Sequence, residues 1–400
     1  MKNRLLIAFA MLTSMLVIVS CAEDGTSQIV INDNSVTTTN NNTGTGGNTG
    51  GNTGGQDIDL VGNITSDTTL DMNNNYTIVG PTIVQDGVTL TIPAGMTIKA
   101  AATGADVYLA VAQGGKIIAE GTSSNPIVMT SASQTPNAGD WGGLILLGKA
   151  PINSVASGTA TSEIGNLPYG GSINDDNSGI LRFVRVEYSG GKASGQSENN
   201  GISFYGVGNG TQVEYVQVYA GKDDGIEFFG GTVNASKISV VGAEDDSIDW
   251  TEGYTGTITD AYVKHLTTHD KAIEADGFNT DIGNNSNPVF WSNPTVINLT
   301  IVGLGSSVAS EAVRLRAGTR TFMENVHISG YNEGFDLDDA ETGVGVTSMI
   351  TFVDKVKFDD VNVQMKNDTG AAFTIADFLL EDATATGTDY ATWGAGWTRQ

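Results

Sequence analysis

Val213–Gly253, with the sequence VEYVQVYAGKDDGIEFFGGTVNASKISVVGAEDDSIDWTEG, contains the same unit twice. In each copy an apolar-polar-apolar triplet is followed ten residues later by a second one, with acidic residues between them: Val216-Gln217-Val218 leads to Ile226-Glu227-Phe228, and Ile238-Ser239-Val240 leads to Ile248-Asp249-Trp250. Alternation with period two places Ile226 and Phe228 on one face of a strand and Glu227 on the other. The stretch therefore predicts pairs of short β-strands joined by acidic turns.

The first triplet recurs along the chain, beginning at residues 184, 216, 238, 263, 299 and 326. A unit of twenty-odd residues cannot bury its own apolar face, so the copies must stack and share a core. A leucine-rich repeat would show a leucine and asparagine ladder, and a propeller blade needs roughly 40 residues. Short strands joined by Gly, Asp and Asn turns instead predict an all-β fold, a parallel β-helix whose coils stack about 4.8 Å apart.

The repeat sets the expected domain organisation. We expect one solenoid over residues 57–370, because a solenoid grows along one axis and is not limited in size by a single compact core. Strand patterns are weak in 57–79, which we expect to cap the N-terminal end of the solenoid. The tail, residues 371–400, leaves the repeat; we expect a short helix in 373–380, and Trp393 and Trp397 to plug the C-terminal end.

The N-terminal region has the features of an exported lipoprotein. Residues 1–20 combine a positively charged start with the apolar run Leu5–Val19, which is short for a membrane span and typical of a signal peptide. The run ends in Ile18-Val19-Ser20-Cys21, which resembles the bacterial lipobox, and Cys21 is the only cysteine. Residues 21–56 are rich in Asn, Thr and Gly and predict a flexible tether. We expect the protein to be anchored to the outer membrane through a lipid on Cys21.

The chain is strongly acidic. Its formal net charge is −26, which becomes −28 when Lys2 and Arg4 leave with the signal peptide. Such a field repels nucleic acid, so nucleic acid is excluded as a partner. Cations or basic partners are the natural counterparts of this surface.

Stacking of the repeats predicts a ladder of carboxylates. The middle residues of the second triplets, Glu227, Asp249 and Glu274, fall in successive coils, and like charges at that spacing repel. Oxygen-rich clusters of this kind suit Ca²⁺. The alternative is that turn carboxylates bond to their own backbone and that the ladder is solvated. The candidate Ca²⁺ ligands are Asp223, Asp224, Glu227, Asp245, Asp246, Asp249 and Glu274.

Aromatic residues near strand ends offer a second candidate site, because aromatic faces pack well on sugar rings. The candidate glycan-binding residues are Trp141, Trp250, Tyr254 and Trp291, although each could equally be a core residue. His265 and His269 lie four residues apart, but they fall in a strand context, where they cannot share a metal. We interpret both as turn or surface histidines.

Several strings resemble a family of right-handed parallel β-helix lipoproteins found in Bacteroidota. They include IPAGMTIKA at 92–100, GDWGGLILLGKAPIN at 139–153 and DDSIDWTEGYTG at 245–256, and the resemblance spans most of residues 80–340. It implies a right-handed solenoid exposed at the cell surface, and the acidic pair Glu23-Asp24 behind Cys21 looks like the surface-export signal of such lipoproteins. The resemblance implies no particular activity.

The leading functional hypothesis is a non-enzymatic module that binds a glycan, a cation or a partner protein, as an accessory to an outer-membrane transporter. The low-periodicity insertion at 149–180 is a natural place for binding surface. The alternative is a polysaccharide lyase or glycoside hydrolase. Asp245-Asp246-Ser247 and Asn279-Thr280-Asp281 invite comparison with polygalacturonases, but their order is reversed and the expected histidine and Arg-x-Lys motifs are missing.

Overall fold

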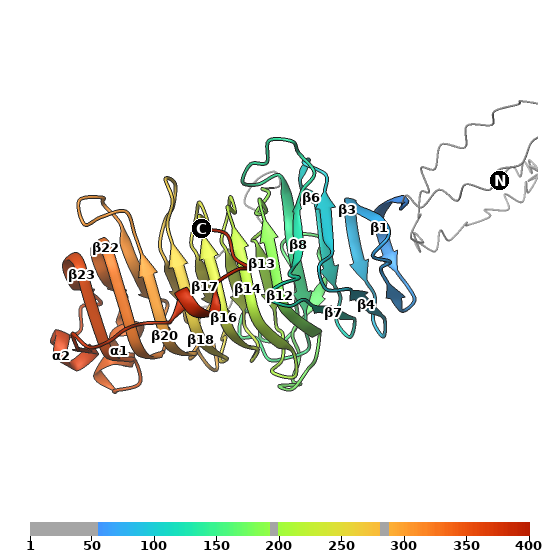
Figure 1. The fold of residues 1–400 in the computed structure, drawn as a ribbon. Helices are drawn as coiled ribbons and strands as arrows, with labels where there is room; N and C mark the ends of the chain where they lie inside the picture. The colour runs from blue at the N-terminus through green and yellow to red at the C-terminus, as the bar shows by residue number, and fades with distance from the viewer. Residues whose placement is uncertain (1–54, 193–198, 281–287) are drawn as a thin grey trace, which may run out of the picture.

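A computed structural model describes residues 55–192, 199–280 and 288–400. These residues form an elongated right-handed parallel β-helix, as the sequence predicted (Figure 1). The expected signal peptide, Cys21 and nearly all of the expected tether lie outside the described residues. Among the residues described, no helix is both long enough and apolar enough to cross a bilayer.

One sheet of 22 strands makes up the described solenoid. Its first strands are β1 (Asp57–Ile64), β2 (Thr68–Thr69), β3 (Asn75–Val84), β4 (Thr89–Ile92), β5 (Thr97–Ala100), β6 (Gly104–Val111), β7 (Lys116–Glu120), β8 (Ile127–Ser131) and β9 (Trp141–Leu147). The later strands are β12 (Gly179–Glu187), β13 (Ile202–Tyr205), β14 (Gln212–Tyr219), β15 (Ile226–Phe229), β16 (Asn234–Val241), β17 (Ile248–Thr251), β18 (Thr257–Lys264), β19 (Ile273–Asp276), β20 (Thr295–Val302), β21 (Glu311–Arg316), β22 (Phe322–Asp338), β23 (Phe352–Asp368) and β24 (Leu379–Glu381).

Each central coil has three strand segments, because its longer strand is bent in the middle. In β14 the pairing with β16 skips Tyr215, whose φ of 55° belongs to the left-handed region. This conformation is unusual for a bulky residue and turns the chain at a corner of the coil. The same corner recurs, with φ between 49° and 59°, at Phe183, Lys237, Asp260, Asn298, Asn325 and Lys355.

The register places equivalent residues of the repeat directly above one another. Ile226, Glu227 and Phe228 pair with Ile248, Asp249 and Trp250 of the next coil. The predicted orientation is confirmed, because Ile226 and Phe228 are buried while Glu227 lies outside the apolar core. Phe228 stacks on Phe204 and Tyr254, with ring centroids 5.2 and 4.4 Å apart. The core is therefore built of columns, as stacking requires.

The two ends of the solenoid differ from expectation in detail. At the N-terminal end no separate cap precedes the repeat among the described residues, because β1 already pairs in parallel with β3 as part of the first coil. At the other end, helices α1 (Ala340–Thr347) and α2 (Ile375–Phe378) lie beside the last coil, and buried Phe378 packs on Phe335 with ring centroids 5.2 Å apart. Helix α2 confirms the short helix predicted in the tail.

The prediction that Trp393 and Trp397 plug the C-terminal end is wrong. After β24 the tail, with the short helix α3 (Tyr390–Trp393), turns back along the side of the solenoid, so that the C-terminus lies beside the middle coils (Figure 1). There the two tryptophans form a cluster with the corner residues Phe183 and Tyr215 and with Tyr262. The reason is that Phe378 already fills the end of the core, which leaves the tail's aromatic residues to cover a lateral face.

Candidate functional site

A cleft of about 1060 Å³ lies on the lateral face formed by the short strands β15, β17 and β19 and by β21. Its floor is the predicted ladder: Glu227 pairs with Asp249, Asp249 with Glu274, and Glu274 with Arg314. The lining contains ten carboxylates and three basic side chains. The carboxylates are those of Glu163, Asp223, Asp224, Glu227, Asp245, Asp246, Asp249, Glu252, Asp270 and Glu274, and the basic residues are Lys271, Arg314 and Arg316.

One wall of the cleft is the insertion between β9 and β12, which contains the antiparallel pair β10 (Ala160–Thr161) and β11 (Pro168–Tyr169). Tyr169 fixes it to the solenoid, because its hydroxyl donates a hydrogen bond of 2.8 Å to Glu252 Oε2 and its ring lies 4.8 Å from that of Tyr205. Tyr205 in turn stacks on Phe229 at 4.0 Å. The insertion predicted as binding surface thus borders the cleft that contains the acidic ladder.

All seven predicted Ca²⁺ ligands line this cleft. One oxygen from each of Asp224, Glu227 and Asp249 lies within 4.8 Å of the others, and the same is true of Asp246, Asp249 and Glu274. The ladder is not an open solvated face, since Asp249 Oδ1 is buried and accepts no hydrogen bond. The cluster could accept a cation or the hydroxyl groups of a ligand.

Burial changes the acidity of these groups. It raises the pKa of Asp224, Asp246 and Asp249 well above the ordinary value for aspartate, and the nearest carboxylates add to the shift: Asp246 acts on Asp224, and Glu274 acts on the other two. Burial and then Asp249 raise the pKa of Glu227 in the same way, although Asn200 donates it a hydrogen bond. A buried carboxylate without enough counter-charge favours its protonated form.

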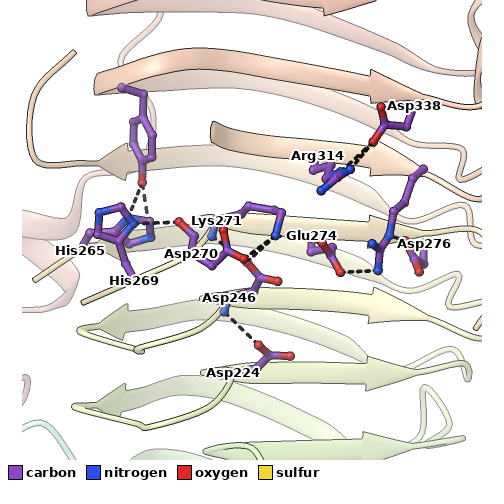
Figure 2. A network of polar contacts seen from close by, with 12 residues as sticks. Asp224, Asp246, His265, His269, Asp270, Lys271, Glu274, Asp276, Arg314 and Asp338 are labelled. Carbon is purple, nitrogen blue, oxygen red and sulfur yellow. Dashed lines mark hydrogen bonds and ion pairs between the residues drawn. The ribbon is translucent and has the colours of Figure 1, made fainter. Parts of the chain in front are cut away.

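Basic side chains neutralise one end of the cleft (Figure 2). Lys271 Nζ lies 2.8 Å from Asp270, 3.0 Å from Glu274 and 3.7 Å from Asp246. Burial alone would lower the pKa of Lys271, but Asp246 and Glu274 raise it above its ordinary value. Arg316 forms ion pairs with Glu274 and Asp276. The charge is thus uneven: carboxylates dominate at Asp224 and Glu227, and ion pairs dominate from Glu274 onward.

Sequence reasoning missed Lys271, although the repeat contains its signal. Lys271 stands two residues before the first residue of β19. Asp224 and Asp246 occupy the equivalent position, two residues before β15 and β17. The backbone N–H of Asp246 donates to Asp224 Oδ1 at 2.9 Å, and that of Lys271 donates to Asp246 Oδ1 at 2.7 Å. Aligning the third copy with the first two would have placed a lysine at the end of this acidic column.

The proposed aromatic platform is not formed. Trp141 and Trp250 are fully buried, and their indole N–H groups donate to Glu187 O and Thr319 Oγ1. Tyr254 is also buried in the core. Trp291 is half-buried under the guanidinium of Arg320, which lies 4.4 Å from its ring, and it does not line the cleft. The first three residues cannot stack on a sugar, because the apolar core covers their faces.

His265 lies in the turn that follows β18, as interpreted, but it is not a surface histidine. Its side chain is buried, its Nδ1 lies 3.0 Å from the hydroxyl of Tyr331, and its ring stacks on that of His269 at 4.2 Å (Figure 2). Burial, with a smaller contribution from His269, lowers the pKa of His265 to about 3. The turn after β18 folds back, which brings together two rings that an extended strand would separate.

Comparison with known proteins gives a family. The family described as pectate-lyase like beta helix domain matches residues 62–398. Two solved structures of a GH87 alpha-1,3-glucanase catalytic domain, each in complex with tetrasaccharides, are similar at 8% and 9% identity with TM-scores of 0.32 and 0.25. They match 81% and 84% of this chain and 69% and 64% of their own. No curated protein matches. The chain belongs to the pectate-lyase-like β-helix domain family.

Proposed function

We propose that the protein is a surface glycan-binding module whose ligand lies in the acidic cleft. The observation that carries the proposal is the cleft itself, about 1060 Å³ in volume, lined by carboxylates and bordered by the Tyr169 insertion. Pockets of this order suit small ligands and short oligomers, and convergent polar groups give them specificity. Membership of a family described as pectate-lyase like supports the same ligand class, because pectate is a polysaccharide.

The charge of the cleft selects among glycans. Ten carboxylates face three basic side chains, so an acidic polysaccharide would meet repulsion unless a divalent cation bridged it to the lining. A neutral glycan or one with amino groups meets no such barrier. Ca²⁺ is the cation we propose for the bridging role, because the lining offers only oxygen ligands around the unpartnered Asp249 Oδ1.

Calorimetric titration with three oligosaccharide classes tests this. We expect chitosan oligosaccharides or neutral glucans to bind without added cation, and oligogalacturonate only with Ca²⁺. Glu227→Gln should weaken binding at least tenfold, whereas Glu324→Gln, at an exposed pair with Lys355, should not change it. If none of the three classes binds below millimolar concentration, or if both variants behave like the wild type, the cleft is not a glycan site.

Glycoside hydrolysis is the second candidate, favoured by one pair of groups. Asp249, whose pKa is raised, stands directly opposite Glu274, which is ion-paired with Lys271 and Arg316. A carboxyl group with a raised pKa beside an ion-paired carboxylate is the arrangement that glycosidases use. Hydrolysis would be established if the protein releases new reducing ends from the same panel of glycans and if Asp249→Asn and Glu274→Gln abolish this release. If the glycans stay intact, the cleft binds them without cleaving them.

We further propose that the module is anchored in the outer membrane through a lipid on Cys21 and faces the cell exterior. The support is the sequence, with its lipobox-like Ile18-Val19-Ser20-Cys21 and single cysteine. Cys21→Ala should move the protein from the membrane to the soluble fraction and abolish labelling by an alkynyl palmitate analogue. Continued membrane association of the variant would contradict the anchor, and resistance of intact cells to protease shaving would contradict surface exposure.

A further inference from the structure

A second group of carboxylates lies outside the lining of the cleft, on the last coils of the solenoid. Glu311 begins β21 and pairs directly with Glu333 of β22, and Asp336 follows three residues later on the same strand. One carboxylate oxygen from each of the three residues lies within 4.8 Å of the others. Strand pairing, rather than a flexible loop, therefore holds the three side chains together.

The three carboxylates are under-satisfied in a way that turn-capping aspartates are not. Glu311 Oε2, Glu333 Oε2 and Asp336 Oδ1 are each buried and accept no hydrogen bond. Asp336 is only 1% exposed, so water cannot replace the missing partner easily. Buried polar atoms are nearly always paired, and an unpaired charged group is costly to bury. Three neighbouring residues that each carry such an oxygen indicate a missing positive partner.

Lys366 supplies only part of that charge. Lys366 Nζ lies 3.1 Å from Asp336 Oδ2 and 3.9 Å from Glu333 Oε2, and it is shared with Asp368 at 3.0 Å. The nearest arginine, Arg314, is already paired with Asp338 at 2.6 Å. Counted against Lys366 alone, the three carboxylates have a formal charge of −2, which matches a divalent cation; the charges of Arg314 and Lys271 also act on Glu311, but both side chains are held in ion pairs with other carboxylates.

We propose that Glu311, Glu333 and Asp336 bind one Ca²⁺ ion, at a site separate from the cleft. Ca²⁺ accepts six to eight oxygen ligands at 2.3–2.6 Å, so two ligands of one ion lie at most about 5 Å apart, and the 4.8 Å limit on these oxygens fits. Mg²⁺ requires 2.0–2.1 Å and near-octahedral geometry, which fits a wide three-carboxylate site less well. Glu311 and Glu333 are half-buried, so water completes the coordination.

Burial, and then Asp336, raise the pKa of Glu311 above its ordinary value in the absence of metal. Metal binding requires deprotonated carboxylates, so this shift opposes Ca²⁺ binding at low pH. The ion would join β21 to β22 near the C-terminal end of the core. It therefore serves to stabilise that end of the solenoid.

The test uses a background in which the cleft carries Asp224→Asn and Asp249→Asn, so that Ca²⁺ in the cleft does not obscure the result. In EDTA-treated protein of this background, CaCl₂ should raise Tm more than MgCl₂ or NaCl at matched ionic strength, and calorimetry should give one Ca²⁺ per chain. Adding Glu311→Gln and Glu333→Gln should abolish that binding and raise Tm in EDTA. The control pair Glu120→Gln and Glu324→Gln removes the same charge from one exposed and one partly exposed position outside the cluster and should retain the site.

Several outcomes would overturn the site. These are an absence of Ca²⁺ binding below millimolar concentration in the background protein, equal effects of the three salts, or undiminished binding after Glu311→Gln and Glu333→Gln. In any of these cases Lys366 and water alone compensate the cluster. If the double substitution prevents folding, Glu311→Gln alone should still weaken Ca²⁺ binding at least tenfold.

Discussion

Asp249 carries an unfavourable charge on the cleft floor, because one of its oxygens is buried without a hydrogen bond and Glu274 stands opposite. Its pKa is raised in the folded chain from an unfolded value near 3.8, so the folded chain binds more protons above that pH. Stability must therefore fall as pH rises from about 4 through the raised pKa. We predict that Asp249→Asn raises Tm at pH 7 and flattens its decline between pH 4 and 8, since each pKa unit is worth about 1.4 kcal/mol.

Asp175→Asn is the matched control, because it removes the same charge from an exposed side chain. It should change the free energy of unfolding by less than about 0.5 kcal/mol. Thermal melts at several pH values compare the two variants in the absence of divalent cations. If both give the same gain at pH 7, general repulsion and not the buried charge at Asp249 accounts for the pH dependence.

The same residue shows what the sequence could and could not reveal. Period-two alternation placed Asp249 outside the core and in line with Glu227 and Glu274, and the register confirms it. That alternation also places Trp250, which aligns with Phe228, inside the core, so its assignment to a glycan platform conflicted with the pattern. The depth of the cleft was not predictable, because its wall comes from 149–178, whose contacts are not encoded by the repeat.

At the scale of elements, the C-terminal tail holds several coils together. Gln217 of β14 and Ser239 of β16 point away from the core yet are fully buried, because Tyr390 and the tail cover them. Gln217 Nε2 also donates to the backbone oxygen of Arg399 at 2.9 Å. Neither contact follows from the repeat, since the sequence of the tail does not say which face it covers. The tail therefore adds contacts across β14 and β16 on the side of the strands that faces away from the core.

We predict that Trp397→Ala destabilises the protein by about 3–5 kcal/mol, because Trp397 is buried between the tail and Phe183. Hydrogen exchange should become faster in β14 and β16, while glycan binding in the cleft stays unchanged, since no residue of the tail lines it. Chemical denaturation and hydrogen exchange measure the two effects. Trp291→Ala, at a half-buried tryptophan, should cost less. Equal costs at both positions would mean that the tail adds little to the solenoid.

At the scale of the whole molecule, charge opposes the fold. The chain has 45 acidic and 19 Lys or Arg residues, so more than half of the carboxylates have no basic partner even if every Lys and Arg pairs with one. Stacked coils hold many of these charges at fixed, short spacing, and the resulting repulsion is stronger in the folded chain than in an expanded one. The sequence therefore already predicts that the stability of the folded solenoid depends on its counter-ions.

We predict that NaCl raises the free energy of unfolding most steeply between 0.01 and 0.15 M, where the screening length falls from about 30 to about 8 Å, and much less above that range. Surface ion pairs such as Lys355 with Glu324 weaken over the same interval, but exposed pairs contribute at most about 1 kcal/mol each. Choline chloride should act like NaCl, because screening does not depend on the cation. Denaturation curves that are independent of salt, or that shift downward with it, would show that ion pairing outweighs repulsion and that the acidic surface is already neutralised.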